Sequence, residues 1–83
     1  EALNDELQKA LKIWPNPGNQ LIGIQYDNNI ESIELLNLEG RTLNTWTIGK
    51  RHTKLNLSNY PRGFYIVNIY SGGSILKKKI ILD

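Results

Sequence analysis

The chain has 83 residues, the size of one small domain, and it contains no Met, so we expect it to be a piece of a longer protein. It contains no Cys either, which excludes disulfides, thiolate zinc sites and cysteine nucleophiles. Ten Lys and Arg residues against eight Asp and Glu residues leave a net charge of +2, too weak to indicate a nucleic-acid partner. The composition therefore predicts a small folded domain that depends on its apolar core alone.

The first ten residues differ from the rest of the chain. Leu3, Leu7 and Leu11 are spaced as on one face of a helix. Ten residues are nevertheless too few for an isolated helix to be stable in water. We therefore interpret residues 1–10 as a linker or cleavage region, with a docked helix as the alternative, and place the folded domain at residues 11–83.

From residue 11 onward, short β-prone runs alternate with turn residues, as in an all-β sandwich or barrel. The runs predict seven strands, at residues 11–14, 20–26, 30–38, 41–48, 53–57, 64–70 and 74–82. Tight turns between such runs force neighbouring strands to be antiparallel. The predicted fold is therefore an all-β, seven-stranded antiparallel immunoglobulin-like β-sandwich, preceded by a short N-terminal linker.

The residues between these runs are interpreted as turns. The Pro-Asn-Pro-Gly sequence at 15–18 predicts a rigid turn, because proline cannot donate to a β-ladder. Residues 27–29 predict a second turn, and residues 49–52 a polar loop. Gly40 and the Gly72-Gly73 pair suit the positive-φ positions of hairpin loops.

Residues 60–63 fit a type I turn, with Pro61 at the second position and Gly63 at the fourth. We expect turn geometry to be the role of these two residues. Replacing Gly63 by Val should then unfold the domain rather than remove a contact.

The sequence offers no convincing catalytic arrangement. Its only His, His52, follows two basic residues that disfavour the protonated imidazole and oppose base catalysis. Glu31 and Glu34 are three apart on a predicted strand and so point to opposite faces, a poor geometry for an acid–base pair. One His without Cys also excludes the usual zinc sites. We therefore predict no enzyme activity, no catalytic or metal-binding residue, and no cofactor.

The densest charge cluster is Lys77-Lys78-Lys79, in the last predicted strand. Along a strand Lys77 and Lys79 share one face, and Lys78 takes the other. Lysines protect an edge strand from aggregation, and they are also a feature that a partner can recognise. Trp14 and Trp46 could stack on sugars, but we favour core or half-buried packing for both.

Four landmarks occur in one order along the chain. They are Ile13-Trp14-Pro15-Asn16-Pro17, Leu36-Asn37-Leu38-Glu39-Gly40-Arg41, Leu57-Ser58-Asn59-Tyr60-Pro61-Arg62-Gly63-Phe64-Tyr65-Ile66-Val67, and Lys77 to Ile81. Together they resemble the type A C-terminal sorting domain of the type IX (Por) secretion system, and the likeness covers residues 11–83. The motif and turn residues that carry it are Trp14, Pro15, Asn16, Pro17, Gly40, Arg41, Pro61, Gly63 and Tyr65.

Two positions depart from the family pattern. Trp14 stands where the family more often has Tyr or Phe. Asn37-Leu38-Glu39-Gly40 stands where the family often has an Asp-x-x-Gly-Arg turn.

The resemblance implies that the domain is a sorting signal rather than an enzyme. Such domains end proteins that Bacteroidetes-type Gram-negative bacteria export, and they direct a folded cargo protein from the periplasm to an outer-membrane translocon. A sortase-like cysteine peptidase usually removes the domain, and the cargo finishes at the outer-membrane surface or outside the cell. The implied partners are therefore type IX translocon components and this peptidase, with no nucleic acid and no small-molecule substrate.

We expect recognition by the translocon on the terminal hairpin, and cleavage between residues 1 and 12. The recognition residues we predict are Gly72, Gly73, Lys77, Lys78 and Lys79. Two alternatives stay open. A carbohydrate-binding or adhesive β-sandwich module of a secreted enzyme would show Trp14, Trp46 and Tyr residues clustered on one exposed face. A structural spacer resembling a fibronectin-type domain would have further sequence after Asp83.

Overall fold

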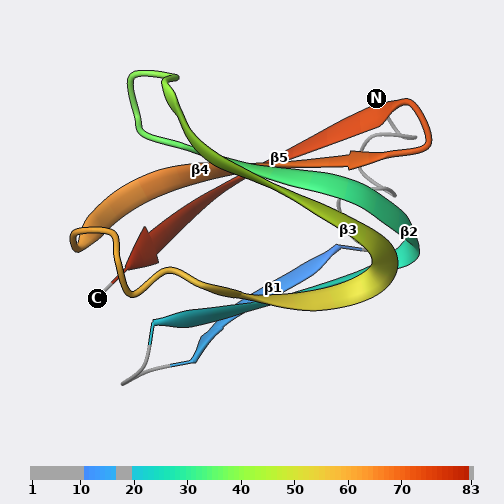
Figure 1. Ribbon diagram of the computed structural model, residues 1–83, viewed down its shortest axis with the longest axis horizontal. Coiled ribbons are helices and arrows are strands. Elements are labelled where there is room, and N and C mark those ends of the chain that lie inside the picture. The colour runs from blue at the N-terminus through green and yellow to red at the C-terminus, as the bar shows by residue number, and fades with distance from the viewer. Residues whose placement is uncertain (1–10, 17–19, 83) are drawn as a thin grey trace.

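The computed structural model describes residues 11–16 and 20–82, and these ranges form five antiparallel strands without a helix (Figure 1). The strands are β1 (Lys12–Asn16), β2 (Leu21–Leu36), β3 (Thr42–Asn56), β4 (Gly63–Ser71) and β5 (Ser74–Leu82). The prediction of an all-β antiparallel fold is confirmed. Our expectations for residues 1–10 and for Pro17 lie outside the described residues. Within those ranges, no helix is long and apolar enough to cross a membrane.

Five strands stand where the sequence predicts seven, because two expected breaks are bends inside continuous strands. Residues 27–29 lie within β2, and residues 49–52 lie within β3. Asn, Asp and Gly favour turns, but they also tolerate the irregular backbone of a bulge. The two expected chain reversals are therefore wrong, and an immunoglobulin-like arrangement of seven strands is not confirmed.

A bulge explains how β2 and β3 bend together. Gln25 lies opposite His52 and Ile30 lies opposite Lys50, so the four residues 26–29 of β2 face one residue of β3. Extra residues on one strand of a pair bend it and increase its twist. The pair therefore forms a long curved ribbon, visible in Figure 1 as the two ribbons that sweep across the molecule.

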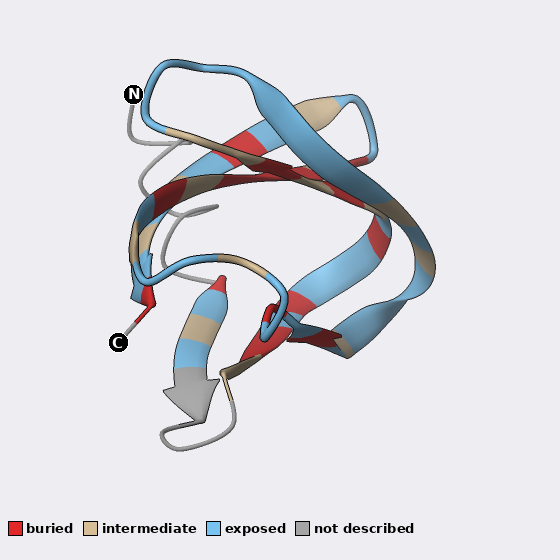
Figure 2. Cartoon of the chain, turned by 60° about the vertical axis from the view of Figure 1, so that its left-hand side comes forward, coloured by how far each residue is buried: buried red, intermediate tan, exposed pale blue. Residues whose placement is uncertain are grey.

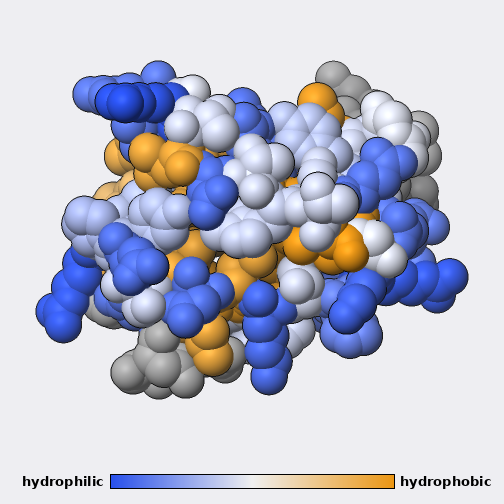
Figure 3. All heavy atoms as spheres, in the orientation of Figure 1, coloured by the Kyte–Doolittle hydropathy of each residue, from blue (hydrophilic) through white to orange (hydrophobic). Residues whose placement is uncertain are grey.

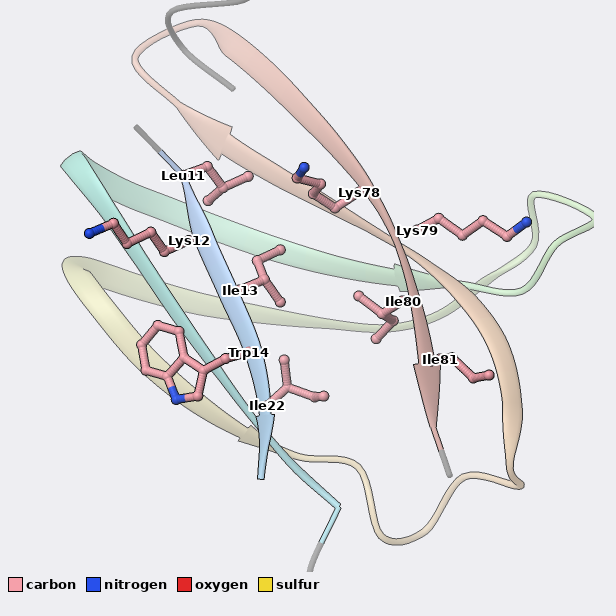
Figure 4. Close-up of a pocket in the computed structure, with 9 residues that line it drawn as sticks. All are labelled: Leu11, Lys12, Ile13, Trp14, Ile22, Lys78, Lys79, Ile80 and Ile81. Carbon is pink, nitrogen blue, oxygen red and sulfur yellow. The ribbon is translucent and has the colours of Figure 1, made fainter. Parts of the chain in front are cut away.

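The sheet is built on β2, because both edges of this strand are used. β3 pairs along one edge of β2, while β1 pairs with residues 21–25 and β4 with residues 32–36. β5 then extends the sheet beyond β4. Since β1 and β4 lie on opposite sides of the bend, the sheet curls, and its two outer strands β1 and β5 approach each other (Figures 1 and 4).

The hydrophobic core fills the inside of this curl (Figure 2). Its buried apolar residues are Leu11, Ile22, Ile24, Tyr26, Ile30, Ile33, Leu35, Leu55, Leu57, Tyr65, Val67, Ile69, Leu76 and Leu82. Along β2 the inward positions are even up to Ile30 and odd from Ile33 onward. Alternate residues of a regular strand face opposite sides, so the register shift between Ile30 and Ser32 keeps both sets inside.

The turn between β2 and β3 is a hairpin closed by Asn37. The Asn37 Oδ1 atom accepts the backbone N–H groups of Glu39, at 3.0 Å, and Arg41, at 2.9 Å. Gly40 has a φ of +88° and donates its N–H to the Asn37 carbonyl, so the positive-φ role predicted for it is confirmed. Asn and Asp both form such turns, so Asn37 supplies the acceptor oxygen that an Asp would supply at this position.

The two turns that flank β4 differ from each other. Gly72 and Gly73 have φ values of +54° and +82° and form the predicted two-residue loop between β4 and β5. A hydrogen-bonded turn precedes β4 at residues 57–60, where the Tyr60 N–H donates to the Leu57 carbonyl. The type I turn predicted at residues 60–63 stays a prediction. Gly63, the first residue of β4, still has a φ of +144° that L-residues with side chains disfavour.

Candidate functional site

The terminal hairpin of β4 and β5 carries the predicted recognition residues. Its last strand has two distinct faces, because neighbouring side chains alternate. Lys77 and Lys79 are exposed on the outward face, whereas Lys78 is half-buried on the inward face between Leu76 and Ile80. The three lysines are therefore not one cluster, and the two faces of β5 present different chemistry.

The outward face of this hairpin exposes large apolar side chains. Phe64 and Ile81 are cross-strand partners that are 51% and 48% exposed, and Ile75 is 60% exposed. The Lys79 ammonium lies 4.8 Å from the centre of the Phe64 ring, a cation–π contact. Phe64 and Ile81 thus form an exposed apolar pair beside Lys79, a feature that a protein partner can contact, and Ile75 lies roughly 20 Å away along β5, next to the turn. Figure 3 shows apolar atoms exposed between hydrophilic side chains on the face turned to the viewer.

The tip of the hairpin lies apart from these lysines. The turn at Gly72 borders a polar hollow of about 340 Å³, whose other walls include Asn29 and Glu31 from the bend of β2. The Ser71 hydroxyl donates a hydrogen bond of 2.6 Å to the Asn29 carbonyl and fixes the tip against that bend. A strand rises about 3.3 Å per residue, so the lysine run lies roughly 10–20 Å from the turn.

A polar network on the outward side of the sheet has no counterpart in the sequence-based predictions. The hydroxyls of Thr42 and Tyr70 donate to the Glu34 carboxylate, the latter over 2.6 Å, and the Asn68 amide donates over 3.3 Å. The hydrogen bond from Thr42, followed by that from Tyr70, holds the pKa of Glu34 below its ordinary value of 4.5. Glu34 in turn raises the pKa of Tyr70 above 10.0. Because these residues come from three strands, no local sequence pattern could reveal the network.

Tyr65 and Pro61, both predicted motif residues, are joined by one hydrogen bond. The Tyr65 hydroxyl donates to the Pro61 carbonyl over 2.5 Å, and the Tyr65 ring meets Tyr60 edge-on with a centroid distance of 6.4 Å. A tyrosine near the start of a strand that bonds back to the preceding corner resembles the tyrosine corner of β-sandwich folds. The contribution of both residues here is structural.

The remaining motif residues occupy separate places. β1 continues through Pro15 and Asn16, which pair with Ile22 and Leu21, so the strand runs past the turn that we expected at Pro15. Arg41 is exposed in the turn before β3. The described members of this set therefore lie in separate elements of the fold.

The two tryptophans do not form a shared sugar-stacking platform. Trp14 is 39% exposed, so the core or half-buried packing that we favoured for it is wrong. Its indole lies over Gly23 of the neighbouring strand, so closely that a Cβ atom on Gly23 would overlap the ring. Trp46 is half-buried and packs against the core. The exposed aromatic face expected of a carbohydrate-binding module is therefore not formed by these two residues.

His52 is exposed in β3. Within residues 11–16 and 20–82, no group of three or more His, Cys, Asp or Glu side chains is placed to hold a metal ion.

Comparison with known families places the whole of this fold in one group. The family model described as the secretion system C-terminal sorting domain matches residues 12–83. No curated protein shows a significant match. Because the family match begins with the first residue of β1 and contains all five strands, it rests on the complete fold rather than on one motif. The chain therefore belongs to the family of secretion system C-terminal sorting domains.

Proposed function

We propose that the chain directs a folded cargo protein from the periplasm to the outer-membrane translocon of the type IX secretion system. The family match supports one part of this proposal, namely that the chain is a sorting signal for type IX secretion toward the outer membrane or cell surface. This family consists of signals rather than catalysts. The cargo then reaches the outer-membrane surface or leaves the cell, and a sortase-like cysteine peptidase removes the domain.

The terminal hairpin is the surface that we propose for translocon recognition, through Gly72, Gly73, Lys77, Lys78 and Lys79. A receptor that acts on folded cargo must contact side chains or backbone groups on the surface of the domain. Here the exposed residues Ile75 and Ile81 lie on the same outward face as two of the lysines. An accessible edge strand also offers backbone groups to a partner. This apolar and basic face, on the last strand of a domain matched by the sorting family, is the observation that carries the proposal.

Cleavage would fall between residues 1 and 12, next to the domain. Residues 1–10 lie outside the described structure, and their sequence is rich in polar side chains. Proteolysis concentrates in exposed polar segments at the edges of domains. Mass spectrometry of the released domain tests this, and a new N-terminus beyond Pro17 would refute it.

An export assay tests the proposed function directly. A Sec leader and a fluorescent reporter are fused to residues 1–83, and the fusion is expressed in strains with and without the type IX translocon. We expect reporter at the surface or in the medium only when the translocon is present. Retention in the periplasm of both strains, while the host's own cargo is exported normally, would contradict the proposal. The reporter with the leader alone serves as the control.

A further inference from the structure

A groove of about 620 Å³ separates β1 from β5, the two outer strands of the curled sheet (Figure 4). Leu11, which directly precedes β1, and Ile13 of β1 reach into it, as do Ile80 of β5 and Ile22 of β2. Its volume falls within the range of sites that bind ligands, roughly 300–1,000 Å³. The floor is therefore an apolar surface large enough to hold side chains of another molecule.

Lys78 is the only charged residue on the inward face of β5, where its neighbours are Leu76, Ile80 and Leu82. Figure 4 shows its side chain directed into the space between the two strands. Among the described residues, its ammonium group has no hydrogen bond or ion pair. A lysine stem can cover apolar surface while its ammonium stays in water, and a carboxylate on a bound partner could pair with that ammonium.

The walls of the groove are strand edges that pair on one side only, within the described part of the chain. β5 pairs with β4, and β1 pairs with β2. A free edge offers unpaired N–H and C=O groups to an incoming strand. Pro15 leaves β1 without one N–H donor, so the nine-residue β5 is the better template.

We propose that this groove binds an extended acidic and apolar segment of a partner protein, added as a strand along β5, with a carboxylate at Lys78. Lys78 is directed into the groove, whereas the side chains of Lys12 and Lys79 at its rim point away from it (Figure 4). No Asp or Glu among the described residues lines the groove, so Lys78 gives it a positive charge with no opposing carboxylate. A second copy of the chain fits poorly, because antiparallel pairing of two β5 strands would bring their lysine runs together. The inference goes beyond the sorting role and does not depend on it.

Peptide titration of the purified 83-residue chain tests the proposal. The probe is a fluorescein-labelled peptide of nine residues, the length of β5, in which Val alternates with Glu. We expect saturable binding, measured by fluorescence anisotropy, that weakens as salt is added. A peptide that alternates Val with Lys should not bind. In NMR spectra the amide signals of β5 and β1 should shift on binding, while those of β3 stay in place.

Two charge-matched variants locate the site. Lys78→Glu should weaken binding by about tenfold or more, and Lys78→Gln should weaken it less. Lys50→Glu makes the same change of charge at an exposed position of β3 and should change affinity by less than about twofold. Denaturation curves show whether each variant remains folded.

Three outcomes would overturn the proposal. The first is no binding by the folded wild-type chain, or equal losses in Lys78→Glu and Lys50→Glu. The second is tighter peptide binding by a full-length variant in which Glu1, Asp5 and Glu6 are changed to the corresponding amides. That result would mean that the chain's own first ten residues compete with the peptide for the groove. The third is a dimer in sedimentation experiments that the peptide dissociates, which would make a second copy the occupant.

Discussion

β3 and β5 are both edge strands, but they expose opposite chemistry. The first half of β3 presents mainly polar side chains to solvent, including Thr42, Asn44 and Thr45. The outward face of β5 instead presents Ile75 and Ile81 with two lysines between them. Polar residues make an edge unattractive to other chains, whereas exposed isoleucines invite contact and require lysines to limit aggregation. This difference is the basis for our proposal that partners contact β5 rather than β3.

The largest effect should separate the two faces of β5. Leu76→Ala removes a buried side chain and should lower the free energy of unfolding by about 2–5 kcal/mol. Its neighbour Ile75 faces solvent, so Ile75→Ala should cost less than about 0.5 kcal/mol. Urea denaturation of both variants provides the measurement. Similar losses in the two would show that the faces are not distinct.

Gly63→Val should weaken the whole hairpin through the backbone. The φ of +144° at this first residue of β4 is unfavourable for valine, and the strain should cost about 1–3 kcal/mol. Apart from the two neighbouring residues of the chain, nothing lies within 4 Å of the place that a Cβ atom would occupy, so crowding of the Cβ atom is not the cause. Thermal denaturation measures it. Unchanged stability in Gly63→Val would contradict the strained geometry.

The Glu34 network should make stability depend on pH at both extremes. The pKa of Glu34 is lowered in the folded chain, so its stabilisation is present above the ordinary value of 4.5 and is lost as pH falls through the folded-state pKa. The pKa of Tyr70 is raised, so its contribution is present below 10.0 and is lost as pH rises through the folded-state value. Unfolding free energies measured across pH test both limbs. Glu34→Gln should remove the part of the stability loss at low pH that this residue causes. An unchanged dependence of the unfolding free energy on pH would contradict that role.

The smallest effect should come from the cation–π contact on the outward face of β5. Lys79→Gln removes the charge above Phe64 and should cost about 0.5–1 kcal/mol. Lys77→Gln changes an exposed lysine on the same face and serves as the matched control for stability. Denaturation curves for the two variants give the difference. An equal change in both would assign the effect to net charge alone.

The sequence predicts most of the local structure, because alternation and turn residues are local signals. Ile22, Ile24 and Tyr26 alternate as a strand should, and all three are buried. The signal at residues 27–29 misled us, because the same polar residues suit a turn and a bulge. Only the pairing of β2 with β3 through the bend distinguishes these two structures.

The candidate site was less predictable from sequence. Alternation along a strand separates Lys78 from the other two lysines, and the structure places it on the inward face. The groove that it faces depends on how far the sheet curls, and the partners of Glu34 depend on the register of three strands. Neither the curl of the sheet nor the register of its strands follows from a local motif, so both could be learned only from the structure.

The export of charge-matched variants tests the central claim, that the β5 hairpin of this sorting domain is what the translocon recognises. Lys77→Glu with Lys79→Glu reverses two charges on β5, and Lys50→Glu with Lys54→Glu reverses two exposed charges on β3. Each pair is introduced into the reporter fusion after denaturation shows that the domain is folded. We predict that the β5 pair abolishes export and that the β3 pair leaves it intact. Normal export of the β5 pair, or equal loss with both pairs, would contradict the account.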